Sequence, residues 1–491
     1  MSGITVTPTD TELQEQATLL RESHPALGVG KLLAQLKIDH PDWSVSEKRF
    51  KKFVSVTSSA GSDATNVNVN ANGNGNGDTI GLTSTSTSVS QSKSTGDDAL
   101  IAKTGIDHSI DVSKIAPKVK VKMFNVDGKG KGLVAKEKLQ MGELLWQEDP
   151  WIVTNDASLW PYLSSHEMCT QCLTLFPQPN PPLSVMCTYC REAHFCNRLC
   201  YSKASSSSSS SSGAGCSSSA HNDFLCPGQN PGCSALLSFI HQKKARDLDG
   251  VARIIASWKR EREYGDEKLA KEIERRVWGS LARVSQKAKE EERREWPFIS
   301  KDRMEEWRLT HLLILRALNP SPMDEGYKPF QKFLNSKRKS KTTQPLSNEE
   351  EERWFSFESF LELLGLIGLN QESSGGLYAL HSHLNHSCEP NVQVRNLPKG
   401  WIAPTPSELP AELPPPMTAQ TRGTNRISMI VKKTIHPGDE LTISYVDQRL
   451  SRDERRTKLR EQYGFWCACQ RCIKEKKAED AEAQTKAKAT A

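Results

Sequence analysis

The sequence has neither a long hydrophobic run nor an amino-terminal signal. No apolar stretch approaches the ~18 to 20 residues needed to cross a bilayer, and the first residues lack the charged-then-apolar pattern of a secretory leader. Both absences argue against membrane insertion and secretion, so we expect an intracellular protein with no membrane partner. Only 36% of the 491 residues are hydrophobic, which means that part of the chain is solvated instead of packed.

A strong excess of one charge is also lacking. The formal net charge is +6, from 65 basic and 59 acidic residues. This falls well short of the basic stripe that by itself indicates a nucleic-acid-binding protein. Cysteine, by contrast, occurs 13 times. Because thiols in a reducing compartment stay available for metal ions instead of pairing as disulfides, zinc is the first ligand to test.

The first periodic segment predicts a small helical module over residues 1–54. Apolar residues recur at helical spacing from Leu13 to Leu20 and from Val29 to Leu36, and Ser44 precedes Glu47 in the pattern of a capping box. The last of its three predicted helices suits contact with DNA in a helix-turn-helix manner, while the alternative is a solvated basic face. The basic residues of this helix are Lys48, Arg49, Lys51 and Lys52.

Two further segments are predicted to lack a packed structure. Residues 55–116 are rich in Ser, Thr, Asn and Gly, including the run NVNVNANGNGNG, and have too little apolar surface to offset the entropy of ordering. They are predicted to form a disordered linker. The charged tail at 473–491 is predicted to fray.

Strand and helix patterns alternate in blocks after the linker, which predicts an α+β fold. Short β-type runs separated by glycine turns begin near residue 117, and strand-like segments resume at VQVR and ISMIVKKTI around a proline-rich run. Between these blocks, residues 234–370 show helical periodicity in IIASW, LTHLLILRAL and FLELLGLIGL. A polar stretch near residues 334–353 of this helical insert is predicted to be a surface loop.

Paired cysteine spacings form a block of eight candidate metal ligands. Zinc takes four tetrahedral nitrogen or sulfur ligands, and a C-x-x-C turn directs both sulfurs at one ion, so eight ligands fit two closed structural sites. Cys216 is an alternative ligand for the second site, whereas Cys233 is expected only to pack. The eight candidates are Cys169, Cys172, Cys187, Cys190, Cys196, Cys200, His221 and Cys226.

A third cysteine group and three separated motifs carry a resemblance to a known family. The motifs are GKGKGL at Gly128–Leu133, LNHSCEPN at Leu384–Asn391 and GDELTISY at Gly438–Tyr445, followed by YGFWCACQRC. In this order they closely resemble the SET-domain lysine methyltransferases, and the first cysteine block resembles the MYND finger. From about Val119 to Cys472 the chain is similar to the SET and MYND family, most nearly its fungal branch with histone substrates.

The resemblance implies a β-rich SET domain with a pseudoknot, split by a zinc-binding MYND-type finger and a helical insert. The implied parts are the first part of the SET domain at 117–168, the finger at 169–226, the insert at 227–370, the SET core at 371–450, a zinc segment at 451–472 and the tail at 473–491.

The resemblance also implies three zinc ions, because alternating cysteine pairs of the finger share a metal. The group at the carboxy-terminal end supplies only three ligands by itself, and Cys388 in the NHSC motif is its implied fourth. The implied sets are Cys169, Cys172, Cys196 and Cys200; Cys187, Cys190, His221 and Cys226; and Cys388, Cys467, Cys469 and Cys472.

The implied methyl donor is S-adenosylmethionine. Lys129, Gly130 and Lys131 would approach its amino-acid end, because glycine permits close backbone approach and lysine meets a carboxylate. Hydrogen bonds from Asn385 and His386 would contact the donor. The remaining implied residues are Phe465 beside the adenine and Asn370 as a further contact.

Two tyrosines are the implied catalytic residues. The Tyr445 hydroxyl would orient the methyl donor and the substrate nitrogen, and Tyr463 would line the lysine channel. The alternative for both is ordinary aromatic packing. With these roles the chain is predicted to be a monomeric protein-lysine N-methyltransferase that acts on the amino-terminal tail of histone H4 in the nucleus.

Two other functions remain open at this point. One is methylation of a non-histone protein, which would also fit the cytoplasm, and the other is a MYND-based binding scaffold with an inactive SET domain. Because MYND fingers of relatives bind proline-rich peptides, a scaffold role is compatible with catalysis. The target lysine and the number of methyl groups added are not fixed by these patterns.

Overall fold

The computed structural model divides the chain into two units, Met1–Asp98 with Arg294–Ser300 and Ala99–Arg293 with Lys301–Ala491. Most of the predicted linker, together with Gly128, lies outside the described residues. The structure describes residues 7–24, 27–40, 43–56, 102–124, 129–156, 158–177, 184–205, 208–209, 216–217, 220–292, 299–338, 344–398, 401–402, 404–409, 418 and 421–489.

The described part of the first unit contains a three-helix module, formed by α1 (Asp10–Ser23), α2 (Val29–Asp39) and α3 (Glu47–Val56). Its core is apolar, because the helical spacing of the sequence places Leu13, Ala17, Leu32, Leu36 and Phe50 on facing sides. The predicted capping box of Ser44 with Glu47 is wrong. Ser46 caps α3 instead, with its hydroxyl 3.3 Å from the Arg49 amide.

A four-stranded sheet at the centre of the second unit joins segments that are far apart in the sequence. Its order is β1 (Val119–Phe124), β2 (Gly130–Ala135), β14 (Glu440–Ile443) and β11 (Asn385–His386). Strand β11 lies parallel to β14, whereas the other pairs are antiparallel.

Two three-stranded sheets complete the β-rich region, and both combine strands from before the finger and after the insert. One apolar cluster joins the four-stranded sheet, through Leu133 and Ile443, to the sheet that contains β3 and β13, through Trp146 and Met429. The sheets are β12 (Val392–Arg395), β13 (Ile427–Val431) and β3 (Leu144–Glu148), and β4 (Ile152–Val153), β10 (Gly376–Leu377) and β9 (Gln371–Glu372). The predicted α+β class with a split β-rich domain is therefore confirmed.

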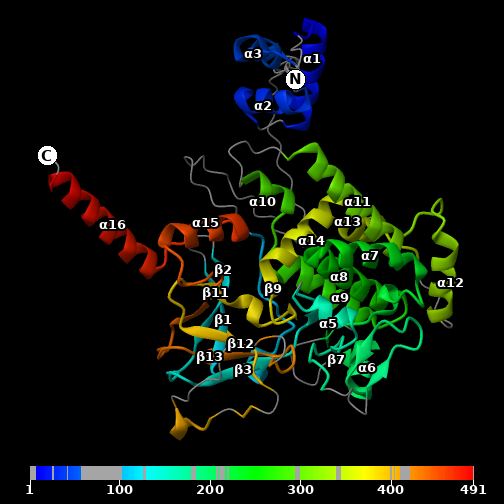
Figure 1. Cartoon of the computed structure of the whole chain (residues 1–491), viewed down its shortest axis with the longest axis vertical. Helices are drawn as coiled ribbons and strands as arrows, with labels where there is room; N and C mark the ends of the chain where they lie inside the picture. The colour runs from blue at the N-terminus through cyan, green and yellow to red at the C-terminus, as the bar shows by residue number, and fades with distance from the viewer. Residues whose placement is uncertain are drawn as a thin grey trace, which may run out of the picture. The chain divides into compact units, whose positions relative to one another are not determined.

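Helices of the insert gather beside the sheets, green to yellow in Figure 1. They pack around stacked tryptophans, with the Trp258 and Trp354 ring centroids 4.5 Å apart. The elements are α7 (Ser234–Lys243), α8 (Arg246–Glu263), α9 (Glu267–Arg275), the π-helical turn η3 (Arg276–Ser280), α10 (Gln286–Glu292), α11 (Lys301–Leu318), α12 (Tyr327–Arg338), α13 (Asn348–Phe355) and α14 (Phe357–Asn370).

The predicted surface loop near residues 334–353 is wrong at both of its ends. Helix α12 continues to Arg338. Helix α13 begins directly after Ser347, which forms a capping box with Glu350 in the first turn of the helix. Two exposed helix ends were thus mistaken for a loop because their polar faces dominate the local composition.

The finger and the segments that flank it have short elements held by turns. They are α5 (Trp160–Ser164), β5 (Val185–Met186), β6 (His194–Phe195), α6 (Arg198–Ser205), β7 (Ser208–Ser209), β8 (Cys216–Ser217), and the 3-10 turns η1 (Asp223–Leu225) and η2 (Pro231–Cys233). Further short turns are α4 (Val112–Ile115), η4 (His381–His383) and η5 (Pro406–Glu408). No described helix is both long and apolar enough to span a bilayer.

Two segments predicted to be loose are ordered. Residues 102–116 are packed within the second unit. The backbone of Lys103 forms an antiparallel β-bridge with that of Arg283, and Ile110 and Ala116 enter the core, so the predicted linker extends too far. The tail is helical, because α16 (Gln470–Ala489) follows α15 (Arg452–Tyr463) and extends outward from it in Figure 1. The prediction of a frayed tail is wrong.

Candidate active site and metal clusters

Three groups of four metal-ligating side chains come together in the described residues. Within each group the ligand atoms all lie within 4.8 Å of one another. Their composition matches the predicted sets: Cys169, Cys172, Cys196 and Cys200; Cys187, Cys190, His221 and Cys226; and Cys388, Cys467, Cys469 and Cys472, named here the first, second and third cluster.

The spacing of the sulfurs fits zinc. Zinc–sulfur bonds of about 2.3 Å in a tetrahedron hold sulfurs about 3.8 Å apart. The sulfur separations are 3.9 Å for Cys172 and Cys196 in the first cluster and 3.8 Å for Cys388 and Cys467 in the third. In the second cluster, Cys190 Sγ lies 3.5 Å from His221 Nε2. Four soft sulfur or imidazole donors without an open position form a structural site.

Local turns build the first two clusters. Each C-x-x-C pair is closed by a hydrogen bond, from the Leu173 amide to the Cys169 carbonyl at 2.9 Å and from the Arg191 amide to the Cys187 carbonyl at 3.0 Å. Leu173 and Arg191 take positive φ angles of 55° and 59°, so each chain reverses directly after the second cysteine. The backbone strain at these residues is the cost of a tight metal turn.

Two cysteines stand outside the three groups. Cys233 is buried, and its burial raises the pKa of its thiol to about 12, which makes it an unreactive packing residue. The Cys216 side chain lies outside the described residues, and the second cluster reaches four ligands without it.

Tyr445, the last residue of GDELTISY, follows strand β14 and contacts the LNHSCEPN motif. Its hydroxyl donates to the Leu384 carbonyl at 2.6 Å, and its backbone amide donates to His386 Nδ1 at 3.0 Å. The Tyr463 ring lies 4.7 Å away, centroid to centroid. Burial raises the pKa of both tyrosines, to about 12 for Tyr463, so both phenols are neutral at physiological pH.

The two lysines of the glycine motif have different surroundings. Lys129 is half exposed and forms an ion pair of 2.9 Å with Glu440. Lys131 is buried, and its ammonium donates to neutral oxygens of Ser280 and Ser382. Burial lowers the pKa of Lys131 to about 7. Of the two, Lys131 is therefore the cation that a carboxylate ligand would stabilise most.

The two glycines that flank Lys131 make a narrow cradle. Gly130 has a φ of 68°, and a Cβ there would lie 2.4 Å from the Thr104 side chain. A Cβ on Gly132 would lie 2.5 Å from Phe124 and 2.9 Å from the Asn385 amide. Any side chain at either position would displace the walls of this cradle.

The two predicted asparagines hold the walls by hydrogen bonds within the protein. Asn385 Nδ2 donates to the Lys131 carbonyl at 2.9 Å and to Glu440 at 2.8 Å. Asn370 Nδ2 donates to the Ala282 carbonyl at 2.7 Å. The bonds of Asn385 join β11 to β2 and β14, and the bond of Asn370 joins the end of α14 to the segment that follows η3.

His386 connects the motif tyrosine to the third cluster. Its Nδ1 accepts from Tyr445, while its Nε2 lies 3.3 Å from Cys388 Sγ. Burial lowers the pKa of His386 to about 4, so the imidazole is neutral. The Phe465 ring lies 6.1 Å from it and completes an aromatic group with Tyr445.

Sequence reasoning missed two features beside the site. Glu440 receives hydrogen bonds from both Lys129 and Asn385, and its place inside GDELTISY was the available signal. Asp107 forms a buried 2.5 Å ion pair with Arg276 at the π-helical turn η3. No local pattern marks Asp107, because its partner lies 169 residues away.

Comparisons with known proteins agree with this arrangement. Residues 130–446 match the family described as SET domain. "Histone-lysine N-methyltransferase SET5" of Mycosarcoma maydis is 29% identical over 369 residues, which cover 70% of this chain and 65% of that protein. The SET5 protein of Meyerozyma guilliermondii is 26% identical over 93% of this chain and 77% of its own length. "Histone-lysine N-methyltransferase SMYD3" of Mus musculus is 24% identical over 74% of this chain and 63% of its own length.

Proposed function

Because the chain belongs to the SET-domain family, we propose that it transfers a methyl group from S-adenosylmethionine to the side chain of a histone lysine. The observation that carries the proposal is the hydrogen bond from the Tyr445 hydroxyl to the Leu384 carbonyl. A phenol that donates its only proton to a backbone carbonyl keeps its oxygen lone pairs for other contacts. That oxygen is suited to accept from a substrate amine and from the polarised C–H bonds of a sulfonium methyl group.

The cradle at Gly130 and Gly132 is the proposed site of the donor's amino-acid end. S-adenosylmethionine supplies the electrophilic methyl group when it is bound. Lys131 would meet the carboxylate, since the hydrogen bonds of its buried ammonium to described residues go to neutral oxygens of Ser280 and Ser382. Phe465 would border the adenine, while Asn370, Asn385 and His386 position the walls through the bonds given above. Lys129 would act at longer range, because Glu440 already holds it.

The lysine nucleophile must arrive as a neutral amine. At pH 7.4 a free lysine of pKa about 10.4 is mostly charged, so its deprotonation costs roughly 4 kcal/mol. A channel lined by the neutral phenols of Tyr445 and Tyr463 disfavours the ammonium by desolvation. The aromatic faces then stabilise the methylated cationic product. No dedicated general base is required.

The three clusters are proposed to hold one structural zinc ion each. Each offers a complete set of four ligands, which leaves no position for a reacting water. The metals would therefore fold the chain without taking part in methyl transfer. Cys388 gives the third zinc a direct path to the active site, because it contacts His386.

We further propose that the substrate is the amino-terminal tail of histone H4 and that the protein acts in the nucleus. Acidic residues of α13 favour a basic tail: Glu349, Glu351 and Glu352 are exposed, while Glu350 is engaged by Arg262. If these charges attract the tail, the Michaelis constant for an H4 peptide should rise as salt shortens the Debye length from about 10 to 3 Å.

The decisive experiment uses purified protein, labelled S-adenosylmethionine and separated core histones, followed by mapping of the labelled lysine. Label on an H4 tail lysine is the expected result. More efficient labelling of a non-histone protein would overturn the substrate, and absence of transfer to every protein offered would support the scaffold alternative.

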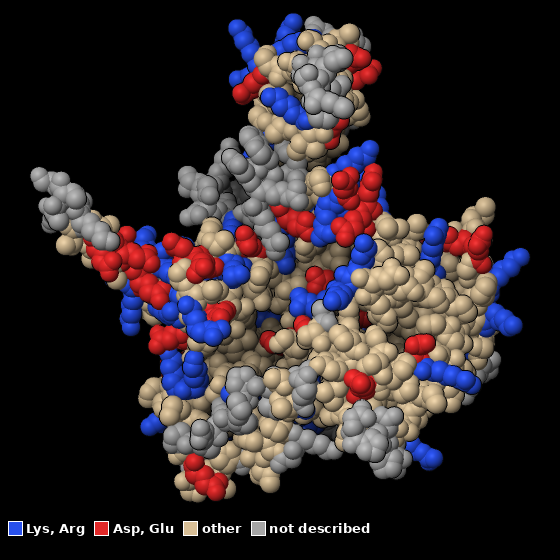
Figure 2. Space-filling view, viewed as in Figure 1, with Lys and Arg blue, Asp and Glu red and all other residues tan. Residues whose placement is uncertain are grey.

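Two accessory contacts are also proposed. Exposed Lys48, Lys51 and Lys52 give α3 a basic surface suited to the DNA backbone, and Figure 2 shows basic side chains projecting from this module. The finger exposes Met186, Tyr189 and Leu199, with exposed fractions of 50%, 60% and 64%. Such an apolar surface suits a proline-rich peptide.

A further inference from the structure

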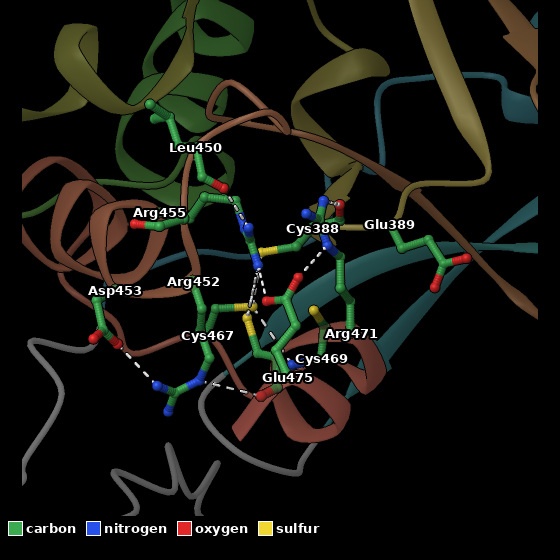
Figure 3. Close-up of polar contacts among 12 residues, drawn as sticks. Cys388, Glu389, Leu450, Arg452, Asp453, Arg455, Cys467, Cys469, Arg471 and Glu475 are labelled. Atoms are coloured by element: carbon green, nitrogen blue, oxygen red, sulfur yellow. Dashed lines mark hydrogen bonds and ion pairs between the residues drawn. The ribbon is translucent and has the colours of Figure 1, made fainter. Parts of the chain in front are cut away.

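A single arginine lies buried against the third cluster. Arg455 of α15 is 0% exposed, and its guanidinium points at the cluster in Figure 3. One terminal nitrogen donates to the Leu450 carbonyl at 2.6 Å, and the other lies 4.0 Å from Cys472 Sγ and pairs with Glu475. The Nε–H is buried and meets no hydrogen-bond partner among the residues that the structure describes.

Neighbouring arginines contact the same segment through its backbone. Arg471 donates to the Cys388 carbonyl at 3.2 Å, and Arg452 donates to the Cys472 carbonyl at 3.2 Å. Both side chains keep substantial contact with carboxylates or solvent, since Arg471 also donates to Glu475 at 2.7 Å. Arg455 differs because it is fully buried and faces sulfur.

Charge explains why such a residue belongs here. A buried guanidinium is costly unless negative charge surrounds it. Four thiolates around one zinc ion carry a net charge of −2, whereas four neutral thiols carry none. Glu475 offers one negative charge, which Arg471 shares. Because one carboxylate is shared by two guanidiniums, the metal-bound, thiolate form of the cluster supplies the further negative charge that balances buried Arg455.

We propose that Arg455 is a positioning residue that balances the negative charge of the third metal–thiolate cluster and, through N–H···S contacts, slows release of its zinc. Through Glu475, the same guanidinium ties α16 to the cluster. This inference rests on the proposed zinc at the third cluster. It predicts that zinc retention depends on the charge at residue 455 more than on the anchoring of α16.

The test measures zinc release from the purified full chain into a chromogenic chelator, together with amide hydrogen exchange of α16. The parent is first analysed for metal together with Cys469→Ser: a zinc content that Cys469→Ser does not lower would refute the proposed third zinc itself. With three present, Arg455→Gln should release one ion about 10- to 100-fold faster, the usual effect of removing a group that orients metal ligands. Arg455→Lys, which keeps the charge, should recover most of the slow release.

Two further variants separate charge balance from simple anchoring. Glu475→Gln should speed amide exchange in α16 while zinc release stays within about twofold of the parent, because the cation beside the sulfurs remains. Arg449→Gln is the matched control, since Arg449 is 90% exposed and pairs with Asp447. Parental zinc release from Arg455→Gln, or equally fast release from Glu475→Gln, would overturn the inference. If Arg455→Gln does not fold, the Lys and Glu475→Gln variants decide it.

Discussion

The finger and the third cluster use the same ligands but are assembled in opposite ways. All eight finger ligands lie within residues 169–226, and tight turns bring each pair together. The third cluster joins Cys388 to sulfurs 79 and 84 residues further along the chain. The finger can therefore form from its own sequence, whereas the third cluster exists only when the catalytic segments have come together.

This difference determines what each metal can influence. Cys388 contacts His386, which in turn accepts a hydrogen bond from Tyr445, so the third cluster is two contacts away from the proposed catalytic hydroxyl. We therefore expect damage to long-range contacts to affect folding and catalysis together, and damage to the finger to remain local.

The largest effect is expected from breaking the buried long-range pair of Asp107 and Arg276. Asp107→Asn leaves the buried Arg276 guanidinium with only its longer, 3.3 Å pair to Glu272. It should lower the free energy of unfolding by about 3 kcal/mol in a denaturant titration. Asp447→Asn, at an exposed pair, should change it by less than about 0.5 kcal/mol. Equal losses of stability in the two variants would contradict the expected difference between the buried and the exposed ion pair.

The same contacts predict the outcome of truncation. A chain that lacks residues 1–98 should keep the stability of the second unit and its activity on peptides. A chain that lacks residues 1–115 should lose both, because this longer deletion also removes Asp107 and the backbone β-bridge between Lys103 and Arg283.

Next in size is the loss of the proposed catalytic hydroxyl. Tyr445→Phe should lower turnover roughly 10²- to 10³-fold, the usual cost of deleting one transition-state contact. Zinc content and the calorimetric affinity for S-adenosylmethionine should stay near parental values. Turnover within threefold of the parent would reduce Tyr445 to a packing residue.

Removing one ligand from each kind of cluster compares the two directly. Cys469→Ser and Cys190→Ser should each lower the zinc content from three to two per chain. Only Cys469→Ser should also lower turnover, by about tenfold or more, since the third cluster holds the active-site segments. Cys233→Ser is the control that keeps three zinc ions. An equal loss of turnover in Cys190→Ser would contradict the expected difference between the finger and the third cluster.

The smallest predicted effect concerns pH. The pKa of Lys131 is lowered to about 7 by burial, so its positive charge is present below pH 7 and is lost as pH rises. Affinity for the donor carboxylate should then fall roughly tenfold between pH 6 and 9, measured by calorimetry. Lys131→Arg stays charged over this range, so its affinity for S-adenosylmethionine should change less with pH. The same pH dependence in both proteins would mean that Lys131 does not bind the donor carboxylate.

Sequence patterns predicted the local metal turns better than the distant contacts. The finger ligands were identified from spacing because a C-x-x-C turn is a local structure. Cys388 was placed only by resemblance to a family, since its partners are far away in the chain. Asp107 carries no local signal, and only its partner Arg276 explains its burial.

The predicted loop near residues 334–353 and the predicted frayed tail were both wrong although the sequence contained helix signals there. In both segments the polar composition outweighed these signals. The Ser347 and Glu350 spacing is a capping box that marks the start of α13. Helix α16 has few apolar residues, but its Ala, Lys and Glu content favours helix, and Arg455 and Arg471 bind Glu475 in its first turns. The individual roles of the site residues, by contrast, stay predictions until the variants are measured.

The sheet order β1, β2, β14, β11 has a consequence for biosynthesis. The central sheet cannot close until residue 443 has left the ribosome, whereas the finger has all of its ligands once residue 226 has emerged. At about 5–20 residues per second, translation between these points takes roughly 10 to 40 s. During that interval a nascent chain can already hold metal in its finger while β2, which pairs with β1, still awaits β14. This is when the unpaired edge of β2 depends most on chaperones.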